Sequence, residues 1–340
     1  MTATYKDLQR ATGLSLATIS KFYNGGTVRD ENAHAIEAAA ATLGFRPNGF
    51  ARSLRSRRSG TIGVLLPALD NDFHLTVIAG VESALRDHGM SVIVSSSPDA
   101  RAGAVDLLLR RMVDGIIAVP SDHDVAALSR AAERVPVVQI DWRADALGTD
   151  GVFLDNHGAG ALAARHLLDH GHRRVGVVAG DPTISTMRER TAGFRSVIER
   201  DGGVLAPDAV VEGPLTVRHG QAAMQRILVL PDRPTAVFCA NYELTLGAVI
   251  ALNESGLTLG RELSVLGFDG LELAQVTVPK LTVIVQPTHE LAVRAADLIR
   301  SRLTAPDDDQ APVDVVVRPR LVAGGSVARL PTGPVTATEA

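Results

Sequence analysis

Five polar side chains stand where a small ligand could be bound. Four of them directly follow short apolar runs and the fifth lies in RERTAGF: Asp141, Asn241, Asp269 and Gln286, and Arg190. Open parallel sheets bind ligands beyond the carboxyl ends of their strands. Carboxylates accept hydrogen bonds from hydroxyls and arginine donates to them, so the set suits a neutral, hydroxyl-rich molecule. Taken singly, such a residue is more often a helix cap at a strand-to-helix turn.

One stretch mimics a cofactor-binding motif. In GVFLDNHGAGALA, Gly158 precedes Asp181 by 23 residues, as in a dinucleotide-binding fingerprint. Asn156 and His157 separate the strand from its first glycine, and Ala163 takes the place of the third, which argues against nicotinamide binding. The sequence also lacks a Gly-x-Ser-x-Gly elbow, a Walker loop and a His-Glu-x-x-His pair. We therefore expect no cofactor and no enzymatic activity.

Histidine and cysteine give little indication of a metal site. His166, His170 and His172 cluster, but no acidic partner is evident, so we predict surface or capping roles and no metal. The single cysteine, Cys239, excludes an internal disulfide and a cysteine metal cluster. Its apolar surroundings, AVFCA, predict a buried strand residue.

The N-terminal segment TYKDLQRATGLSLATISKFYN, residues 4–24, predicts two short helices. Apolar residues recur at helical spacing: Leu8, Ala11, Leu14, Ile19 and Phe22. Gly13 permits a left-handed turn, and Ser15 with Thr18 marks the start of a second helix from about Leu16 to Asn24. This is the helix-turn-helix pattern, although any helical hairpin shows similar spacing.

Charge favours the DNA-binding interpretation. Residues 1–60 hold nine Lys or Arg and four Asp or Glu, a net charge of +5. The whole chain is −4, so the other 280 residues sum to −9. Such asymmetry is expected when one small module contacts phosphates and the remainder does not.

The rest of the chain reads as an α/β protein. Short β-branched runs alternate with helical stretches: TIGVLL, SVIVS, GIIAV, PVVQI, GVFL, RVGVVA, TAVFCA, LSVLGF and LTVIV. Parallel sheets with crossover helices follow, and nine runs suggest two similar lobes. A further helix at about 288–303 and the strands VDVVV and RPRLV would return to both lobes. With no signal peptide and no apolar run of about 18 residues, we expect a cytosolic protein.

A basic linker joins the two parts. In FRPNGFARSLRSRRSG, Pro47 can begin a helix and a narrow apolar stripe lies among arginines. So short a helix is unstable alone, so we expect folding on DNA, with a plain basic linker as the alternative. The last ten residues, PTGPVTATEA, are predicted to be disordered.

Several motifs together resemble the LacI/GalR family of bacterial transcription regulators. They are DLQRATGLSLATISKFYN, AIEAAAATLGFRPNGFARSLRSRRSGTIGVLLP, HLLDHGHRRVGVVAG, RERTAGFR, ALNESGLTLGRELSVLGFDG and LTVIVQP, in order from residue 4 to about 323. The resemblance implies a homodimer that reads a near-palindromic operator in double-stranded DNA. It also implies a core like that of a periplasmic sugar-binding protein, with a small-molecule effector in the cleft between its lobes.

The resemblance assigns DNA contacts to individual residues. In the headpiece these are Tyr5, Ser15, Leu16, Ala17, Thr18, Ser20, Lys21 and Asn24; in the linker they are Asn48, Ala51, Arg52 and Leu54. Leu16, Ala17 and Lys21 match base-contacting positions. Leu54 matches a wedge that kinks the duplex. Lys21 replaces the family's usual Arg, and Gln9 replaces a small alanine.

The five polar residues, together with Phe73 and Trp142 as a flat apolar face for a sugar ring, match effector positions of the family. Two departures obscure the ligand. NDFH, from Asn71 to His74, replaces a usual Asn-Pro-Phe-Phe, and Tyr242 replaces an aspartate. The resemblance implies a sugar or a nucleoside, but the departures suggest an effector unlike the best-known ones.

The predicted organisation has four parts. A helix-turn-helix headpiece spans 1–46, a hinge helix 47–58, an effector-binding and dimerisation core 59–330 and a tail 331–340. Within the core, lobe 1 is about 60–153 and 286–313, and lobe 2 about 154–285 and 314–330. The predicted function is a ligand-responsive transcriptional repressor. The alternatives are a solute-binding protein of the same core fold and an NAD-dependent enzyme.

Overall fold

The computed structural model describes residues 3–23, 26–45, 58–69, 72–96, 103–305 and 311–330. The chain divides into two compact units, Met1–Gly60 and Thr61–Ala340. Each unit has hydrophobic clusters of its own. Of the parts predicted from sequence, most of the hinge and the whole tail lie outside the described residues.

The described residues of the first unit form three helices: α1 (Tyr5–Thr12), α2 (Leu16–Tyr23) and α3 (Asp30–Leu43). Each contributes one fully buried residue to a small core: Leu8, Ile19 and Ile36. Gly13 ends α1 with φ +71°, which confirms the predicted left-handed turn. Ala11, although it has helical spacing, is exposed and outside this core.

Local hydrogen bonds fix where these helices begin. The backbone N–H of Thr4 donates to Asp7 Oδ2 over 2.9 Å, ahead of α1. At the start of α2, the backbone N–H of Thr18 donates to Ser15 Oγ over 3.1 Å. Such caps satisfy N–H groups that have no partner inside the helix. Ser15 and Thr18 thus begin α2, as their sequence positions predict.

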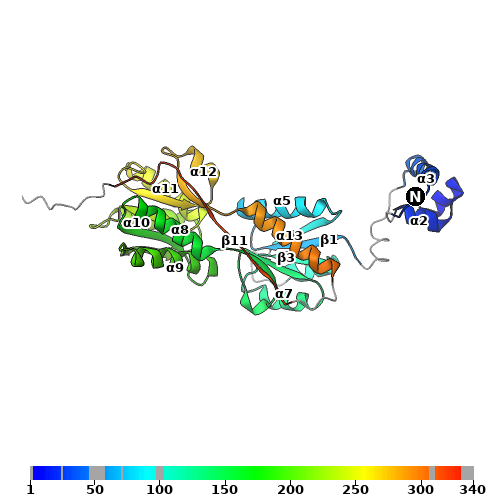
Figure 1. The fold of residues 1–340 in the computed structure, drawn as a ribbon, viewed down its shortest axis with the longest axis horizontal. Coiled ribbons are helices and arrows are strands. Elements are labelled where there is room, and N and C mark those ends of the chain that lie inside the picture. Colours follow the sequence, from blue (N-terminus) through cyan, green and yellow to red (C-terminus); the bar gives the residue numbers. More distant parts are fainter. Residues whose placement is uncertain are drawn as a thin grey trace, which may run out of the picture. The chain divides into compact units, whose positions relative to one another are not determined.

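The first lobe of the second unit is built on one six-stranded sheet in the order β11-β5-β4-β3-β1-β2. Its strands are β1 (Thr61–Leu66), β2 (Ser91–Ser96), β3 (Gly115–Ala118), β4 (Val137–Ile140), β5 (Asp150–Leu154) and β11 (Asp314–Val317), all parallel. Helices α5 (Asp72–Arg86) and α13 (Thr288–Thr304) cover one face, and α6 (Ala104–Arg110) and α7 (Val125–Ala132) the other (Figure 1). A short turn, η1 (Asp145–Leu147), precedes β5.

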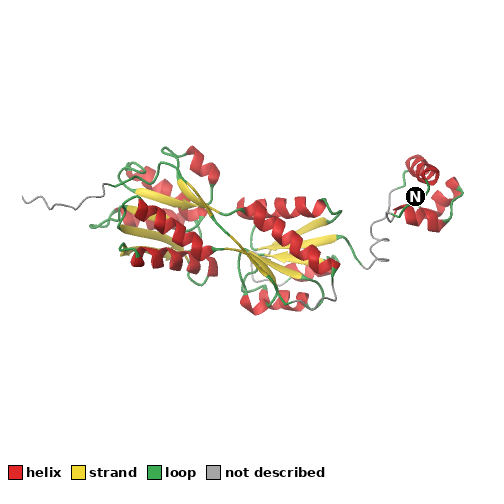
Figure 2. Ribbon diagram, in the orientation of Figure 1, coloured by secondary structure: helices red, strands yellow, loops and turns green. Residues whose placement is uncertain are grey.

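The second lobe has a similar sheet in the order β12-β10-β9-β8-β6-β7. Its strands are β6 (Arg174–Gly180), β7 (Val204–Gly213), β8 (Ala236–Cys239), β9 (Ser264–Phe268), β10 (Thr282–Val285) and β12 (Arg320–Val322). Helices α8 (Asn156–Asp169) and α9 (Ser185–Arg200) pack on one face, and α10 (Val217–Leu228) and α11 (Tyr242–Ser255) on the other. A short helix, α12 (Leu271–Val276), follows β9. Figure 2 shows each sheet between its helical layers.

The chain described here passes between the lobes three times: from β5 to α8, from β10 to α13 and from β11 to β12. One predicted boundary is wrong at the last crossing. The sequence placed residues from 314 onward in lobe 2, but Asp314–Val317 pairs with β5 of the first lobe. The chain returns to the second lobe with β12, which runs antiparallel to β10, and the residues that follow bond to Val265, Ser264 and His170 of that lobe.

All nine apolar runs form strands, and β7 is the strand that sequence reasoning missed. Its segment VLAPDAVVEG contains Pro207 and Asp208, which interrupt the apolar pattern. Proline is tolerated there because β7 lies at the sheet edge, where its pairing with β6 shifts register. Among the described residues, no helix combines the length and apolar character needed to cross a membrane.

Candidate functional site

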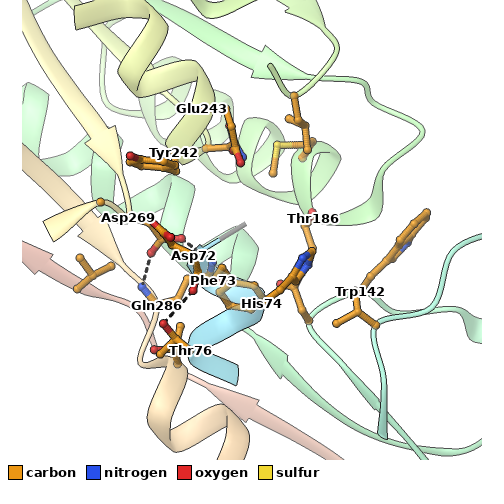
Figure 3. A pocket seen from close by; sticks show the side chains of 18 of the residues that line it. Asp72, Phe73, His74, Thr76, Trp142, Thr186, Tyr242, Glu243, Asp269 and Gln286 are labelled. Carbon is orange, nitrogen blue, oxygen red and sulfur yellow. Dashed lines mark hydrogen bonds between the residues drawn. The ribbon is translucent and has the colours of Figure 1, made fainter. Parts of the chain in front are cut away.

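One cavity of about 560 Å³ is lined by both lobes of the second unit. Helix α5 and the loop after β4 contribute from the first lobe. Helix α9 and the loops after β8 and β9 contribute from the second (Figure 3). All seven side chains predicted to contact a ligand line it: Phe73, Asp141, Trp142, Arg190, Asn241, Asp269 and Gln286.

Two aspartates occupy unusual backbone conformations at the ends of strands. Asp141 follows β4 with φ +66°, and Asp269 follows β9 with φ +56°. This left-handed region costs an L residue about 1 kcal/mol, so surrounding contacts must hold it. Asp269 accepts the Gln286 backbone N–H over 2.9 Å and the Gln286 Nε2–H over 2.7 Å. These bonds tie the loop after β9 to the crossing that follows β10.

Arg190 is buried at the centre of the second-lobe wall. Its Nε donates to Asn156 Oδ1 over 2.8 Å, and its Nη1 donates to the Ala240 carbonyl over 2.9 Å. The guanidinium carbon lies 3.7 Å from the centroid of the Phe268 ring, a cation–π contact. Arg190 therefore joins three strand ends, those of β5, β8 and β9, besides lining the cavity.

The cavity holds acceptors that the protein itself leaves unsatisfied. Within the described residues, Asp141 Oδ1 and Gln286 Oε1 are shielded from solvent and have no hydrogen-bond partner. Burial raises the pKa of Asp141 to about 6, with Arg190 opposing the rise and Asp269 adding to it. Burial also raises the pKa of Asp269. A buried acceptor without a donor is costly, so both oxygens favour a ligand with N–H or O–H groups.

The side chain of Asn241 forms its hydrogen bonds with other residues of the protein. Its Oδ1 accepts the backbone N–H of Leu244 over 3.0 Å at the start of α11, and its Nδ2 donates to Glu243. The capping alternative therefore describes Asn241 well. By contrast, Phe73 and Trp142 are half-buried, pack against the first-lobe core and line the cavity, as expected of an apolar face.

Several lining residues were not predicted from sequence, among them Thr186, Glu243 and Glu272. Helical spacing could have identified Thr186, which lies one turn before Arg190 on α9. Another unpredicted residue, Asn156, accepts one of the hydrogen bonds that Arg190 donates. In the sequence, Asn156 was noted only because it separates the strand from the first glycine of the glycine-rich motif.

That motif has a packing role. A Cβ at Gly160 would lie 1.9 Å from the Arg190 carbonyl oxygen, and one at Gly193 would lie 2.0 Å from the His157 carbonyl oxygen. Both glycines thus allow α8 and α9 to pack closely. Asp155 caps α8 by accepting the Gly158 N–H over 2.7 Å. A carboxylate therefore occupies the helix start where a dinucleotide phosphate would bind.

The histidines and the cysteine have structural surroundings. The His166 and His170 rings lie 4.2 Å apart at the end of α8. His172 is buried and contacts Thr235 Oγ1 and the Ala328 carbonyl. Cys239 is a buried strand residue, as predicted, and burial raises the pKa of its thiol to about 12. Within the described residues, no group of three His, Cys, Asp or Glu is placed to hold a metal.

The predicted DNA-contacting residues of the headpiece divide into two groups. Ser15, Leu16, Ala17 and Lys21 are exposed, with Leu16 at 40% exposure despite its apolar side chain. Thr18, Ser20 and Tyr5 are partly buried. The Tyr5 ring stacks on Tyr23 at 5.7 Å. The remaining five lie outside the described residues: Asn24, Asn48, Ala51, Arg52 and Leu54.

Comparison with known proteins identifies the family. Residues 59–318 match the family model described as periplasmic binding proteins and sugar binding domain of LacI family. The chain belongs to the LacI family. A LacI-family relative, the ribose operon repressor of Haemophilus influenzae, is 32% identical over 311 residues, covering 90% of this chain and 94% of that protein. The repressor PurR of Pasteurella multocida is 30% identical, covering 96% and 98%.

Solved structures of LacI-family proteins have the same fold. The lac repressor dimer bound to operator and the anti-inducer ONPF superposes with a TM-score of 0.85 at 27% identity, covering 96% of this chain and 100% of that one. A LacI-family regulator from Enterococcus faecium with bound ribose gives 0.69 at 27% identity, covering 80% and 100%. This LacI-family chain is thus a DNA-binding transcriptional regulator with a two-lobe α/β core.

The structure shows where residues that depart from the LacI-family pattern lie. Gln9 is half-buried in α1, and its carbonyl accepts the Gly13 N–H that closes the helix over 2.8 Å. Asp72, Phe73 and His74, which belong to the unusual NDFH segment, all line the cavity. Tyr242, at the position of a usual aspartate, lines it from α11. Two of the four departures, the NDFH segment and Tyr242, therefore alter the ligand site itself.

Proposed function

We propose that this regulator represses transcription as a cytoplasmic homodimer and responds to a hydroxyl-rich effector in the interlobe cavity. The observation that carries the proposal is the pair of shielded, unsatisfied acceptors, Asp141 Oδ1 and Gln286 Oε1. They line one cavity with Arg190 and Asp269. Hydroxyl groups would satisfy these acceptors, and a ring could lie against Phe73 and Trp142.

A sugar or a nucleoside fits this chemistry best. One relative is named a ribose operon repressor, and one structural neighbour contains bound ribose. Sugar hydroxyls can donate to carboxylates and accept from a guanidinium, as the polar lining requires. We infer that the chain acts by binding alone, since capping and helix packing account for its dinucleotide-like motif.

The response would couple two equilibria. A ligand that contacts both lobes favours one interlobe orientation over another, and it shifts the equilibrium by its differential affinity for the two. In a dimer, this would change the spacing of the two hinge segments, residues 47–58, and therefore the cost of folding them on DNA. The solute-binding alternative accounts for the core but not for the basic headpiece.

The headpiece would bind operator DNA through α2. Leu16 and Ala17 offer apolar contact, for instance to a thymine methyl, and Lys21 offers a donor to guanine. These side chains make few hydrogen bonds to bases, so the Leu54 wedge would carry much of the operator choice through DNA bending. Leu54→Ala should weaken operator binding while leaving effector affinity intact. Unchanged operator affinity would refute the wedge.

The test begins by selecting operator sequences from random duplex DNA with the full-length protein. Fluorescence anisotropy then measures operator affinity while sugars and nucleosides are added singly, and a thermal-shift screen identifies the binders. At least one binder should change operator affinity, and Gln286→Ala should abolish that change. Enrichment of no DNA sequence would contradict the regulator, whereas enriched DNA with no responsive binder would contradict the effector proposal.

A further inference from the structure

A second, smaller space adjoins the main cavity beside the crossing from β5 to α8. Its volume is about 150 Å³, and Asp141 and Thr186 line both spaces. We call this space the hinge compartment; its other lining residues include Arg143, Ser185, Glu189 and Val316. A space of about 150 Å³ is large enough for one six-membered ring. The main cavity and the hinge compartment together can therefore hold a ligand of two rings.

Two hydroxyl groups of the hinge compartment have no partner in the described part of the chain. Ser185 and Thr186, the first two residues of α9, are only 8% and 7% exposed. Neither side chain forms a hydrogen bond with another described residue. Helix capping does not account for them, because the start of α9 has no side-chain cap. Since buried polar groups are nearly always hydrogen-bonded, both hydroxyls favour a polar ligand, or water in its absence.

The hinge compartment also offers charged groups of both signs. Glu189 of α9 is partly buried, and within the described ranges it has no hydrogen-bond or ion-pair partner. Arg143 comes from the first lobe, where it pairs with Asp314. An anion would be attracted by Arg143 but repelled by Glu189 and Asp141. The hydroxyls of a neutral ligand can accept from the guanidinium and donate to the carboxylates, so they fit this lining better.

The apolar part of the lining favours a sugar ring over a nucleobase. Val316 of β11 lines the compartment and is 58% exposed. A sugar ring has apolar C–H faces besides its hydroxyls, so it can remove Val316 from water. A nucleobase is usually held by stacking on aromatic faces. The Phe153 ring offers little such surface, because the Arg143 guanidinium carbon already lies 4.2 Å from its centroid.

We propose, resting on the proposed function, that the effector is a disaccharide that occupies both spaces. One sugar residue lies in the main cavity and the other in the hinge compartment, with the glycosidic link beside Asp141 and Thr186. The second residue accepts hydrogen bonds from Ser185 and Thr186, donates to Glu189 and covers Val316. Because Val316 belongs to the first lobe and Ser185 and Glu189 to the second, this residue joins the lobes beside a crossing. A monosaccharide would leave the compartment to water.

The test compares disaccharides with their component sugars on the full-length protein by isothermal titration calorimetry. The panel contains maltose, cellobiose, trehalose, lactose, melibiose and sucrose, with glucose, galactose and fructose as components. At least one disaccharide should bind about tenfold more tightly than either of its components. The methyl glycoside of the tighter component should not show this gain, because it has the link but no second ring. Glucose 6-phosphate and uridine are titrated as probes of other occupants.

Two variants locate the effect in the hinge compartment. Val316→Trp should fill it, weakening the disaccharide at least about tenfold and leaving the component sugars and the melting of the core unchanged. Val313→Trp is the matched control, because Val313 is also exposed, directly precedes β11 and lines neither space. Ser185→Ala removes one hydrogen bond and should weaken the disaccharide alone, by about threefold.

The outcomes separate the two proposals. If no disaccharide binds more tightly than its components, or if Val316→Trp weakens both equally, the disaccharide is overturned and a one-ring effector remains. Tighter binding of glucose 6-phosphate or uridine that Val316→Trp weakens also overturns it, since the compartment then binds an anion or a base. Binding of no sugar and no nucleoside contradicts the effector proposal as well. A disaccharide that binds tightly but leaves operator affinity unchanged supports the two-part site and contradicts the allosteric response.

Discussion

In the headpiece, the residues that stabilise the fold differ from those predicted to recognise DNA, whereas in the interlobe cavity one residue can do both. In the headpiece, Leu8, Ile19 and Ile36 form the core, whereas Leu16 and Lys21 are exposed. In the cavity, Arg190 lines the wall and also holds three strand ends together. A recognition residue of the headpiece can therefore change without cost to the fold, while several cavity residues cannot.

The largest expected effect removes the buried arginine. Arg190→Ala would leave Asn156 Oδ1 and the Ala240 carbonyl without their donor and should destabilise the core by about 4 kcal/mol. Calorimetric melting should show a clear drop in the core transition together with loss of effector binding. Arg195→Ala, an exposed change on the same helix, should do neither. An unchanged core transition would show that Arg190, like the exposed residues of the headpiece, can be replaced without loss of stability.

Lowering the pH should test whether a buried titratable group outside the cavity also affects the free energy of unfolding. Burial lowers the pKa of His172 to about 4, so its folded-state pKa lies below the ordinary 6.5. Stability from the neutral ring is then complete above pH 6.5 and is lost as the pH falls toward 4, by up to about 3 kcal/mol. Urea unfolding across this range should show the loss. His172→Gln should flatten it, and an equal slope in both proteins would exclude His172 as the cause.

Asp141 should behave in the opposite sense. Its pKa, raised to about 6, means that the ionised form is disfavoured in the fold, so the stability it contributes is lost as the pH rises from about 4 through 6. Asp141→Asn should therefore stabilise the empty core by about 2 kcal/mol at pH 7.5 while weakening effector binding. Urea midpoints and calorimetry measure the two effects. A variant that is destabilised at pH 7.5 would show that the carboxylate is not under strain.

The smallest effect on stability is expected at the headpiece surface. Lys21→Ala should lower operator affinity about tenfold, because it removes one charged donor to DNA, and should leave melting unchanged. Anisotropy titrations at two salt concentrations would also show a shallower salt dependence if Lys21 contacts phosphate. Any clear loss of thermal stability would mean that this residue, like Arg190, has a structural role.

The sequence predicted elements better than boundaries. Buried strands such as β1 and β8 are continuous apolar runs, so periodicity identifies them. Edge strand β7 escapes because Pro207 breaks its pattern without breaking its pairing. The assignment of Val313 and Asp314 to different lobes was wrong because pairing partners are long-range. Asp150 accepts the Val313 N–H over 2.8 Å from a strand far away in sequence.

In the cavity, too, the sequence identified positions at strand ends but not contacts between segments that are distant in the chain. Residues after strands were identifiable because parallel strands end at one edge, and all seven predicted side chains line the cavity. Asn156 was not identifiable, since its bond to Arg190 crosses from one helix to another. Three further acidic residues of the lining, Asp72, Glu243 and Glu272, looked like ordinary first-turn acids of separate helices. That they line one cavity becomes apparent only when both lobes are in place.

The three crossings between the lobes restrict how the core can move. They follow β5, β10 and β11, each of which lies at or next to one edge of its sheet. Two lobes joined by three short connections that lie close together rotate most easily about one axis, which passes through those connections. Gln286 lies on one crossing, and Asn156 lies at another. An effector held by Gln286 would act close to the axis, where a small displacement produces a large movement at the far ends of the lobes.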